Sequence, residues 1–152
     1  MNARRRAPRR GWALALIALL VTVALSACQS GAPAGDATAL IAEARESLDE
    51  GRTEDALDAA RRAVEADEDS AEAHFVQGNA YAHSDDLARA EASYRRALEL
   101  DPDHADAHSN LGVIYYRQER LAEAESALRA ALERAPDDAE FHYNLGDVLA
   151  SS

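Results

Sequence analysis

The sequence predicts an all-α fold in which helix-turn-helix units stack into a solenoid. Glycine recurs at Gly78, Gly112 and Gly146, 34 residues apart each time, and self-similarity at that period is typical of stacked helical pairs. The apolar content is carried by Ala and Leu, with only 5 % aromatic residues, which favours closely packed helices over sheets. Pro102 and Pro136 are spaced by the same period, and proline cannot continue a helix interior.

The period divides the C-terminal three quarters of the chain into three complete units and a half-unit. The units are residues 37–70, 71–104, 105–138 and 139–152. We expect about seven helices in antiparallel pairs around one continuous core. The first unit is the most divergent, with Ser47 and Ala60 where the second unit has Tyr81 and Tyr94. Terminal repeats are often atypical, so this divergence fits the assignment.

Capping and turn residues predict where the helices begin and end. Asp36 and Thr38 are alternative caps for the first helix, and Gly51 supplies the turn that follows it. In the second unit, Ser84, Asp85 and Asp86 replace the turn glycine, so we expect a looser turn there. The expected helices include residues 37–50, 53–66, 71–83, 87–99 and 139–152.

The charge is distributed very unevenly along the chain. Five of the 16 arginines precede Cys28, so the remaining 11 face 28 acidic residues and give the rest of the chain a net charge of −17. Repulsion from phosphate groups excludes nucleic acid as a partner. A basic protein partner is compatible with this charge, although a simply solvated acidic surface explains it at least as well.

The N-terminal residues have the layout of an export signal. Residues 1–10 are basic and residues 11–27 are apolar, with small residues at the end. The apolar run is shorter than the roughly 20 residues that a spanning helix needs. It ends in Leu25-Ser26-Ala27-Cys28, which resembles the lipobox of bacterial lipoproteins, and Cys28 is the one cysteine of the chain.

The resemblance to the lipobox implies that residues 1–27 are a cleaved signal peptide and that Cys28 carries lipid. Residues 28–36 would then form a short flexible tether. Gln29 after the cysteine implies an outer membrane location facing the periplasm, rather than the inner membrane, in envelopes of the enterobacterial type. Arg9-Arg10 faintly resembles a twin-arginine signal, which is an alternative export route. The other interpretation is that Cys28 is inert in an ordinary signal or an uncleaved anchor.

The small and large residues of each unit resemble the tetratricopeptide repeat. The third unit shows the pattern with Leu111-Gly112 at positions 7 and 8, Tyr115 at 11, Ala124 at 20 and Pro136 at 32. The resemblance covers residues 37–152. It implies a right-handed superhelix whose concave face, lined by the first helix of each unit, binds a protein or an extended peptide.

Carried over by position, the resemblance implies groove residues on the first helices of units two to four. They are Phe75, Asn79, Ser109, Asn110, Val113, Tyr116, Arg117, Tyr143 and Asn144. The three asparagines can pair with peptide backbone, because an amide both donates and accepts. The alternative is that asparagine at position 6 serves local helix packing. The apolar and aromatic members suit an apolar or aromatic ligand segment.

One ligand class of the family is excluded by residue type. Carboxylate-clamp repeats hold a terminal carboxylate with Lys or Arg at three groove positions. Those positions are Phe75, Glu140 and Asn144 in this chain. A terminal carboxylate would therefore find no charge partner there.

No catalytic, metal or cofactor site is expected. His74, His108 and His142 all fall at position 4, where we interpret them as packing residues. His104 and His108 are spaced to share a metal on one helix face, but no third ligand is near in the sequence. The chain has no phosphate-binding loop, zincin motif or nucleophile elbow.

The sequence therefore predicts a membrane-anchored envelope lipoprotein that binds another protein as a scaffold or assembly factor. Three alternatives remain. The open edge after the half-unit could stack on a second copy, giving a homo-oligomer. Short lipoproteins of this repeat class also resemble pilotin-type factors of type IV pilus biogenesis. A carrier of a metal or small ligand is the third.

Overall fold

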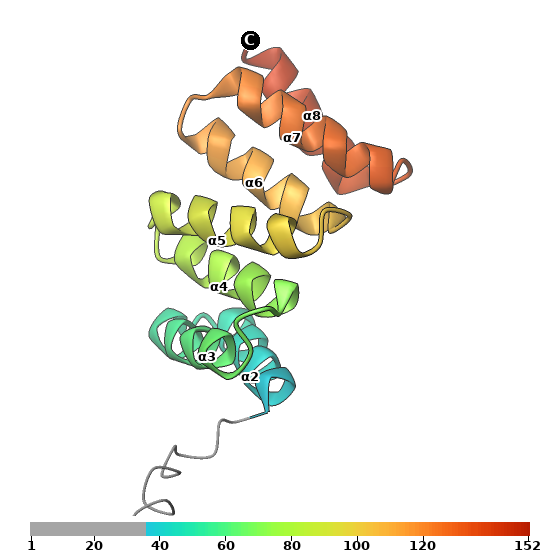
Figure 1. Cartoon of the computed structure of the whole chain (residues 1–152). Helices are drawn as coiled ribbons and strands as arrows, with labels where there is room; N and C mark the ends of the chain where they lie inside the picture. The colour runs from blue at the N-terminus through green and yellow to red at the C-terminus, as the bar shows by residue number, and fades with distance from the viewer. Residues whose placement is uncertain (1–35) are drawn as a thin grey trace, which may run out of the picture. The chain divides into compact units, whose positions relative to one another are not determined.

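The computed structural model describes residues 36–152, which fold into seven helices without a strand (Figure 1). The helices are α2 Ala37–Asp49, α3 Thr53–Ala66, α4 Ala71–His83, α5 Leu87–Leu100, α6 Ala105–Arg117, α7 Leu121–Arg134 and α8 Ala139–Ala150. The prediction of an all-α helical repeat is confirmed. The predictions for the signal peptide, Cys28 and the tether up to residue 35 lie outside the described residues. No helix in the described part is both long and apolar enough to span a bilayer.

The helices pack in chain order along one direction, from α2 to α8 (Figure 1). The pairs α2–α3, α4–α5 and α6–α7 form the units, and each second helix also packs on the first helix of the next unit. First helices of neighbouring units touch directly as well, α2 with α4 and α6 with α8. A single apolar core, from Leu40 to Val148, results from this stacking.

Small residues let the two helices of a unit approach closely. A Cβ added at Gly78 would lie 2.5 Å from Cε1 of Tyr94, and one at Gly112 would lie 2.6 Å from Cγ of Leu128. Both glycines are therefore required by the close packing of the two helices of a unit. Gly146 holds the same repeat position, but a Cβ there would meet nothing within 4 Å, because no second helix covers this side of α8 in residues 36–152.

The turn inside each unit uses one left-handed residue at a fixed repeat position. Gly51, Asp85 and Glu119 have φ of 73°, 64° and 61°. The backbone N–H that follows each of them donates to the carbonyl five residues earlier, at 2.8, 3.0 and 2.9 Å. The expectation of a looser turn at residues 84–86 is wrong, because Asp85 adopts the conformation of the glycine and the closing hydrogen bond is kept.

Side chains cap most of the helices. Asp36 caps α2 by accepting from the N–H of Thr38 at 3.0 Å, which decides between the two predicted caps. Helix α8 ends two residues before the predicted end. The hydroxyls of Ser151 and Ser152 donate to carbonyls four residues earlier at 2.9 and 2.8 Å, and such local bonds compete with further helix.

The histidines at position 4 make a repeated hydrogen bond that the sequence did not reveal. Nε2 of His74, His108 and His142 lies 3.0, 3.0 and 2.7 Å from a backbone carbonyl six residues earlier. Because a carbonyl only accepts, each ring donates from Nε2. Each bond holds the turn between two units against the first helix of the later unit.

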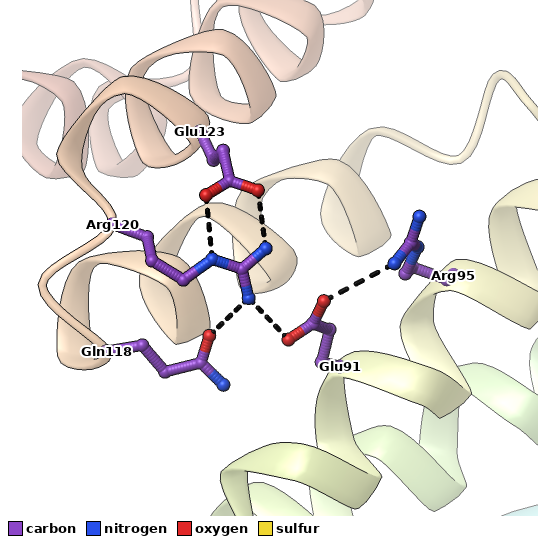
Figure 2. A network of polar contacts seen from close by, with 5 residues as sticks. All are labelled: Glu91, Arg95, Gln118, Arg120 and Glu123. Atoms are coloured by element: carbon purple, nitrogen blue, oxygen red, sulfur yellow. Dashed lines mark hydrogen bonds and ion pairs between the residues drawn. The ribbon is translucent and has the colours of Figure 1, made fainter.

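An arginine on the α6–α7 turn ties the second unit to the third (Figure 2). Arg120 donates to Glu91 of α5 at 2.7 Å, to Gln118 at 2.7 Å and to Glu123 at 2.7 and 2.5 Å. Its guanidinium also lies 4.2 Å from the ring centroid of Tyr115. The hydrogen bonds to Glu123 and Glu91 raise the pKa of Arg120 further above its ordinary value, so its guanidinium keeps its positive charge.

Candidate binding groove

Three adjoining hollows follow the first helices of the repeat units. The largest, about 770 Å³, lies between α2 and the start of α4. It is lined by Thr38, Ile41, Ala42, Arg45, Glu46, Asp49, Glu50, Ser70 and Glu72. Repeat position puts Thr38, Ile41, Arg45 and Asp49 of this lining on the groove side of the first helix, although the predicted site residues lie on units two to four alone. Glu46 was missed altogether, because it occupies position 10, which the resemblance does not assign to the groove.

The other two hollows continue across α4 and α6. One of about 410 Å³ is lined by Arg45, Leu48, Asp49, Asn79, His83 and Asn110. The next, about 170 Å³, is lined by Asn79, Ala82, His83, Tyr94, Asn110, Val113, Ile114 and Arg117. Each hollow shares lining residues with the one before it, so the three adjoin one another along the first helices. We call these three hollows together the groove.

Four of the predicted site residues line the groove, namely Asn79, Asn110, Val113 and Arg117. Two others lie below its surface. Phe75 is 8 % exposed and Ser109 is 1 % exposed, and the Phe75 ring packs with its centroid 4.5 Å from that of His104. These two side chains support the groove floor and offer little surface to a ligand.

Asn79 and Asn110 are joined to each other and to the core. Oδ1 of Asn79 accepts from the hydroxyl of Tyr94 at 2.7 Å and from Nδ2 of Asn110 at 2.9 Å. Burial raises the pKa of Tyr94, so its hydroxyl remains a donor. These contacts fit the alternative that the asparagines serve helix packing. Both asparagines line the two smaller hollows, and within residues 36–152 neither Nδ2 of Asn79 nor Oδ1 of Asn110 has a hydrogen-bond partner.

The remaining predicted residues lie toward α8, outside the lining of these three hollows. The Tyr116 hydroxyl is 3.0 Å from Oγ of Ser151. Nδ2 of Asn144 donates to Oγ of Ser109 at 3.5 Å, the limit of a hydrogen bond. Tyr143 is 68 % exposed, which makes it the most accessible aromatic side chain on α8.

Glu72 of α4 contacts both α2 and the residue that caps α6, at the edge of the groove. Its Oε1 is ion-paired with Arg45 of α2, and its Oε2 lies 3.5 Å from Nε2 of His104, the residue that caps α6. The hydrogen bond from His104 and the charge of Arg45 lower the pKa of Glu72. The same carboxylate raises the pKa of His104. The capping hydrogen bond opposes this increase in the pKa. Nδ1 of His104 accepts from the N–H of Ala107 at 3.3 Å, and protonation of Nδ1 would remove that acceptor.

His104 and His108 are both engaged in contacts within the protein. His104 contacts Glu72 and Ala107 as described, and His108 donates to the carbonyl of Pro102. Burial lowers the pKa of His108. Nowhere in residues 36–152 do three or more His, Cys, Asp or Glu side chains gather in a way that could hold a metal ion.

Comparisons with known proteins agree with this architecture. A family model described as tetratricopeptide repeat matches residues 41–103, 84–139 and 110–152. The first TPR of Spaghetti (RPAP3), solved with a bound HSP90 peptide, is 22 % identical with a TM-score of 0.73, and the match covers 76 % of this chain and 92 % of that chain. The TPR2B domain of yeast Sti1, in complex with pHsp70, is 18 % identical with a TM-score of 0.71, covering 76 % and 98 %.

A third solved structure is an O-GlcNAc transferase from Thermobaculum terrenum. It is 28 % identical with a TM-score of 0.73, and the match covers 76 % of this chain but only 22 % of that chain. The similarity is therefore confined to a minor part of the transferase. Among curated protein sequences, no significant match to this chain is found.

Proposed function

Because the chain belongs to the tetratricopeptide repeat family, we propose that its groove binds an extended segment of a partner protein. The observation that carries this proposal is the row of three adjoining hollows along α2, α4 and α6. The side-chain amides of Asn79 and Asn110 offer a donor and an acceptor for peptide backbone at its centre, and Leu48 and Val113 offer apolar surface. Two structurally similar domains were solved with peptides from HSP90 and Hsp70, which supports this mode of binding.

The second part of the proposal is a lipid anchor in a bacterial cell envelope. It rests on the sequence Leu25-Ser26-Ala27-Cys28 behind an apolar run and five arginines. Three acyl chains at the new N-terminus would give stable attachment, since one chain alone gives only marginal binding. The groove would then act close to the membrane, where the chain serves as a scaffold or assembly factor. Gln29 favours the outer membrane. We assign the chain no catalytic activity.

Site-specific photo-crosslinking in the native host tests the groove. A benzophenone amino acid at Val113 lies in the groove, and the same amino acid at the exposed Ala88 on α5 is the matched control. We expect a discrete crosslinked protein from position 113 and none from position 88. Equal crosslinking from both positions, or none from position 113 and from Leu48, would contradict the groove proposal.

Metabolic labelling tests the anchor separately. With an alkyne fatty acid, the wild-type chain should be labelled and recovered with membranes, and its mature N-terminus should be the modified Cys28. The Cys28→Ser variant should be unlabelled and retain its leader. A wild-type protein whose mature N-terminus lies elsewhere, or a labelled Cys28→Ser variant, refutes the anchor and leaves the groove proposal untouched.

A second candidate function, self-association through α8, is favoured by the bare glycine of the half-unit. Gly146 keeps the residue type that elsewhere admits a neighbouring helix, yet no atom of residues 36–152 would lie within 4 Å of a Cβ there, and Leu149 beside it is 49 % exposed. Light scattering over a concentration series distinguishes the two candidates. A mass that rises to a dimer in the wild type and not in Leu149→Arg supports self-association, and a constant monomer mass excludes it.

A further inference from the structure

The arginines in residues 36–152 are already ion-paired with carboxylates of the same chain. This includes the two arginines of the groove. Arg45 is paired with Glu72 of the next unit, and Arg117 is paired with Asp85 of the preceding unit. An incoming carboxylate therefore has to displace a carboxylate that is covalently part of the protein.

Acidic groups in the groove, in contrast, remain available. Glu46 and Asp49 line the largest hollow, are exposed, and make no side-chain hydrogen bond or ion pair with any residue of the described part. They lie three residues apart on α2, so both carboxylates lie on neighbouring positions of one helix face. Asp49 also lines the second hollow, so this negative charge extends to the centre of the groove.

The floor of the same hollow is apolar. Ile41 and Ala42 line it beside the two carboxylates. This combination suits a long cationic side chain, because Lys and Arg place their methylene stems on apolar surface while the charged head reaches polar groups. A metal ion, which has no apolar part, would gain nothing from contact with Ile41 and Ala42.

We propose that the segment bound in the groove is basic, with an arginine or lysine in the hollow between α2 and α4. The cationic head contacts Glu46 and Asp49, and the stem lies along Ile41 and Ala42. The proposal rests on the proposed function of the groove and specifies its ligand. Charge complementarity carries it, because the cations of the groove are occupied by intramolecular partners and these two carboxylates are not. An acidic segment, such as one rich in glutamate, is the class of ligand that this groove rejects.

Fluorescence anisotropy with designed peptides tests whether the groove prefers a basic ligand. The probes are three labelled nine-residue peptides with amidated C-termini, in which every third residue is Arg, Glu or Gln and the others are Ala. The protein is the full 152-residue chain in a non-ionic detergent at about 0.15 M salt. The groove variant is Glu46→Gln/Asp49→Asn. The control is Glu54→Gln/Glu65→Gln, which removes the same charge from exposed positions of α3 outside the three hollows.

We expect the Arg peptide to bind more tightly than the Gln and Glu peptides. The groove variant should weaken the Arg peptide about five- to tenfold, as expected for two partly exposed charge pairs, and the control variant less than about twofold. Equal weakening by both variants would show general attraction to an acidic protein and overturn the proposal. Tighter binding of the Glu peptide would refute the preference for a basic ligand while leaving the groove function intact. If position 113 crosslinks to a partner but the Arg peptide binds no more tightly than the other two, the preference for a basic ligand is refuted and the groove function stands.

Discussion

The same substitution at three equivalent positions should change stability in opposite directions. Gly78, Gly112 and Gly146 share one repeat position, but only the first two face a packed helix. Replacing Gly78 with alanine puts a Cβ 2.5 Å from a ring carbon of Tyr94. That ring is 2 % exposed, and its hydroxyl is held by Asn79, so it cannot turn aside without breaking a buried hydrogen bond.

The magnitudes follow from two opposing terms. Overpacking a filled core costs about 1–3 kcal/mol, while alanine in place of a helical glycine gains roughly 0.5–1 kcal/mol. Gly78→Ala should therefore lower the free energy of unfolding by about 0.5–2 kcal/mol, and Gly112→Ala by a similar amount against Leu128. Gly146→Ala meets nothing within 4 Å and should raise it by about 0.5–1 kcal/mol.

Urea unfolding followed by circular dichroism at low micromolar concentration measures all three variants. Midpoints are compared at unchanged slope, since a changed slope would indicate a change in the surface exposed on unfolding. A Gly78→Ala protein as stable as the wild type would refute the packing argument. A Gly146→Ala protein that is destabilised would refute the conclusion that this face of α8 is bare.

Three further predictions follow from the turns, the groove edge and the buried tyrosine. Glu119→Gly relieves a left-handed backbone that costs about 1–2 kcal/mol and should stabilise by about 0.5–1 kcal/mol after the entropy of glycine; destabilisation in urea would contradict it. Glu72 has a lowered pKa and His104 a raised one, so their pair is lost as pH falls through the pKa of Glu72 and as pH rises through that of His104. The loss of stability in Glu72→Gln should thus be greater at pH 5.5 than at pH 8.5, by up to about 1 kcal/mol, and an equal loss at both values would refute the pairing. Tyr94→Phe removes the bond to Asn79 and should cost about 0.5–1.5 kcal/mol, and an unchanged unfolding midpoint would show that this bond contributes nothing.

The fold was predictable because its determinants are local and periodic. Glycine and alanine at helix crossings, such as Gly112 and Ala124, recur every 34 residues. The turn conformation was harder to predict. Asp85 and Glu119 adopt the same left-handed φ as Gly51, but only glycine indicates that conformation by its residue type. The hydrogen bonds of His74 and its equivalents were also missed, because the acceptor is a backbone carbonyl and leaves no sequence signal.

The groove was predicted only in part. Repeat position correctly placed Asn110 and Val113 on the first helices, but it could not show that Phe75 and Ser109 are buried, which depends on how neighbouring units tilt against each other. It also could not show the pairing of Arg117 with Asp85, since that contact joins residues 32 positions apart. Repeat position puts Asp49 on the groove side of α2 but does not assign Glu46, at position 10, so the pair of carboxylates in the hollow at α2 was not predicted.

The ion pairs along the groove have a mechanical consequence. Arg45–Glu72 and Arg117–Asp85 each join one unit to the next, and such exposed pairs are weak enough to exchange partners. Bending between units is therefore resisted mainly by the apolar contacts of the continuous core rather than by these pairs.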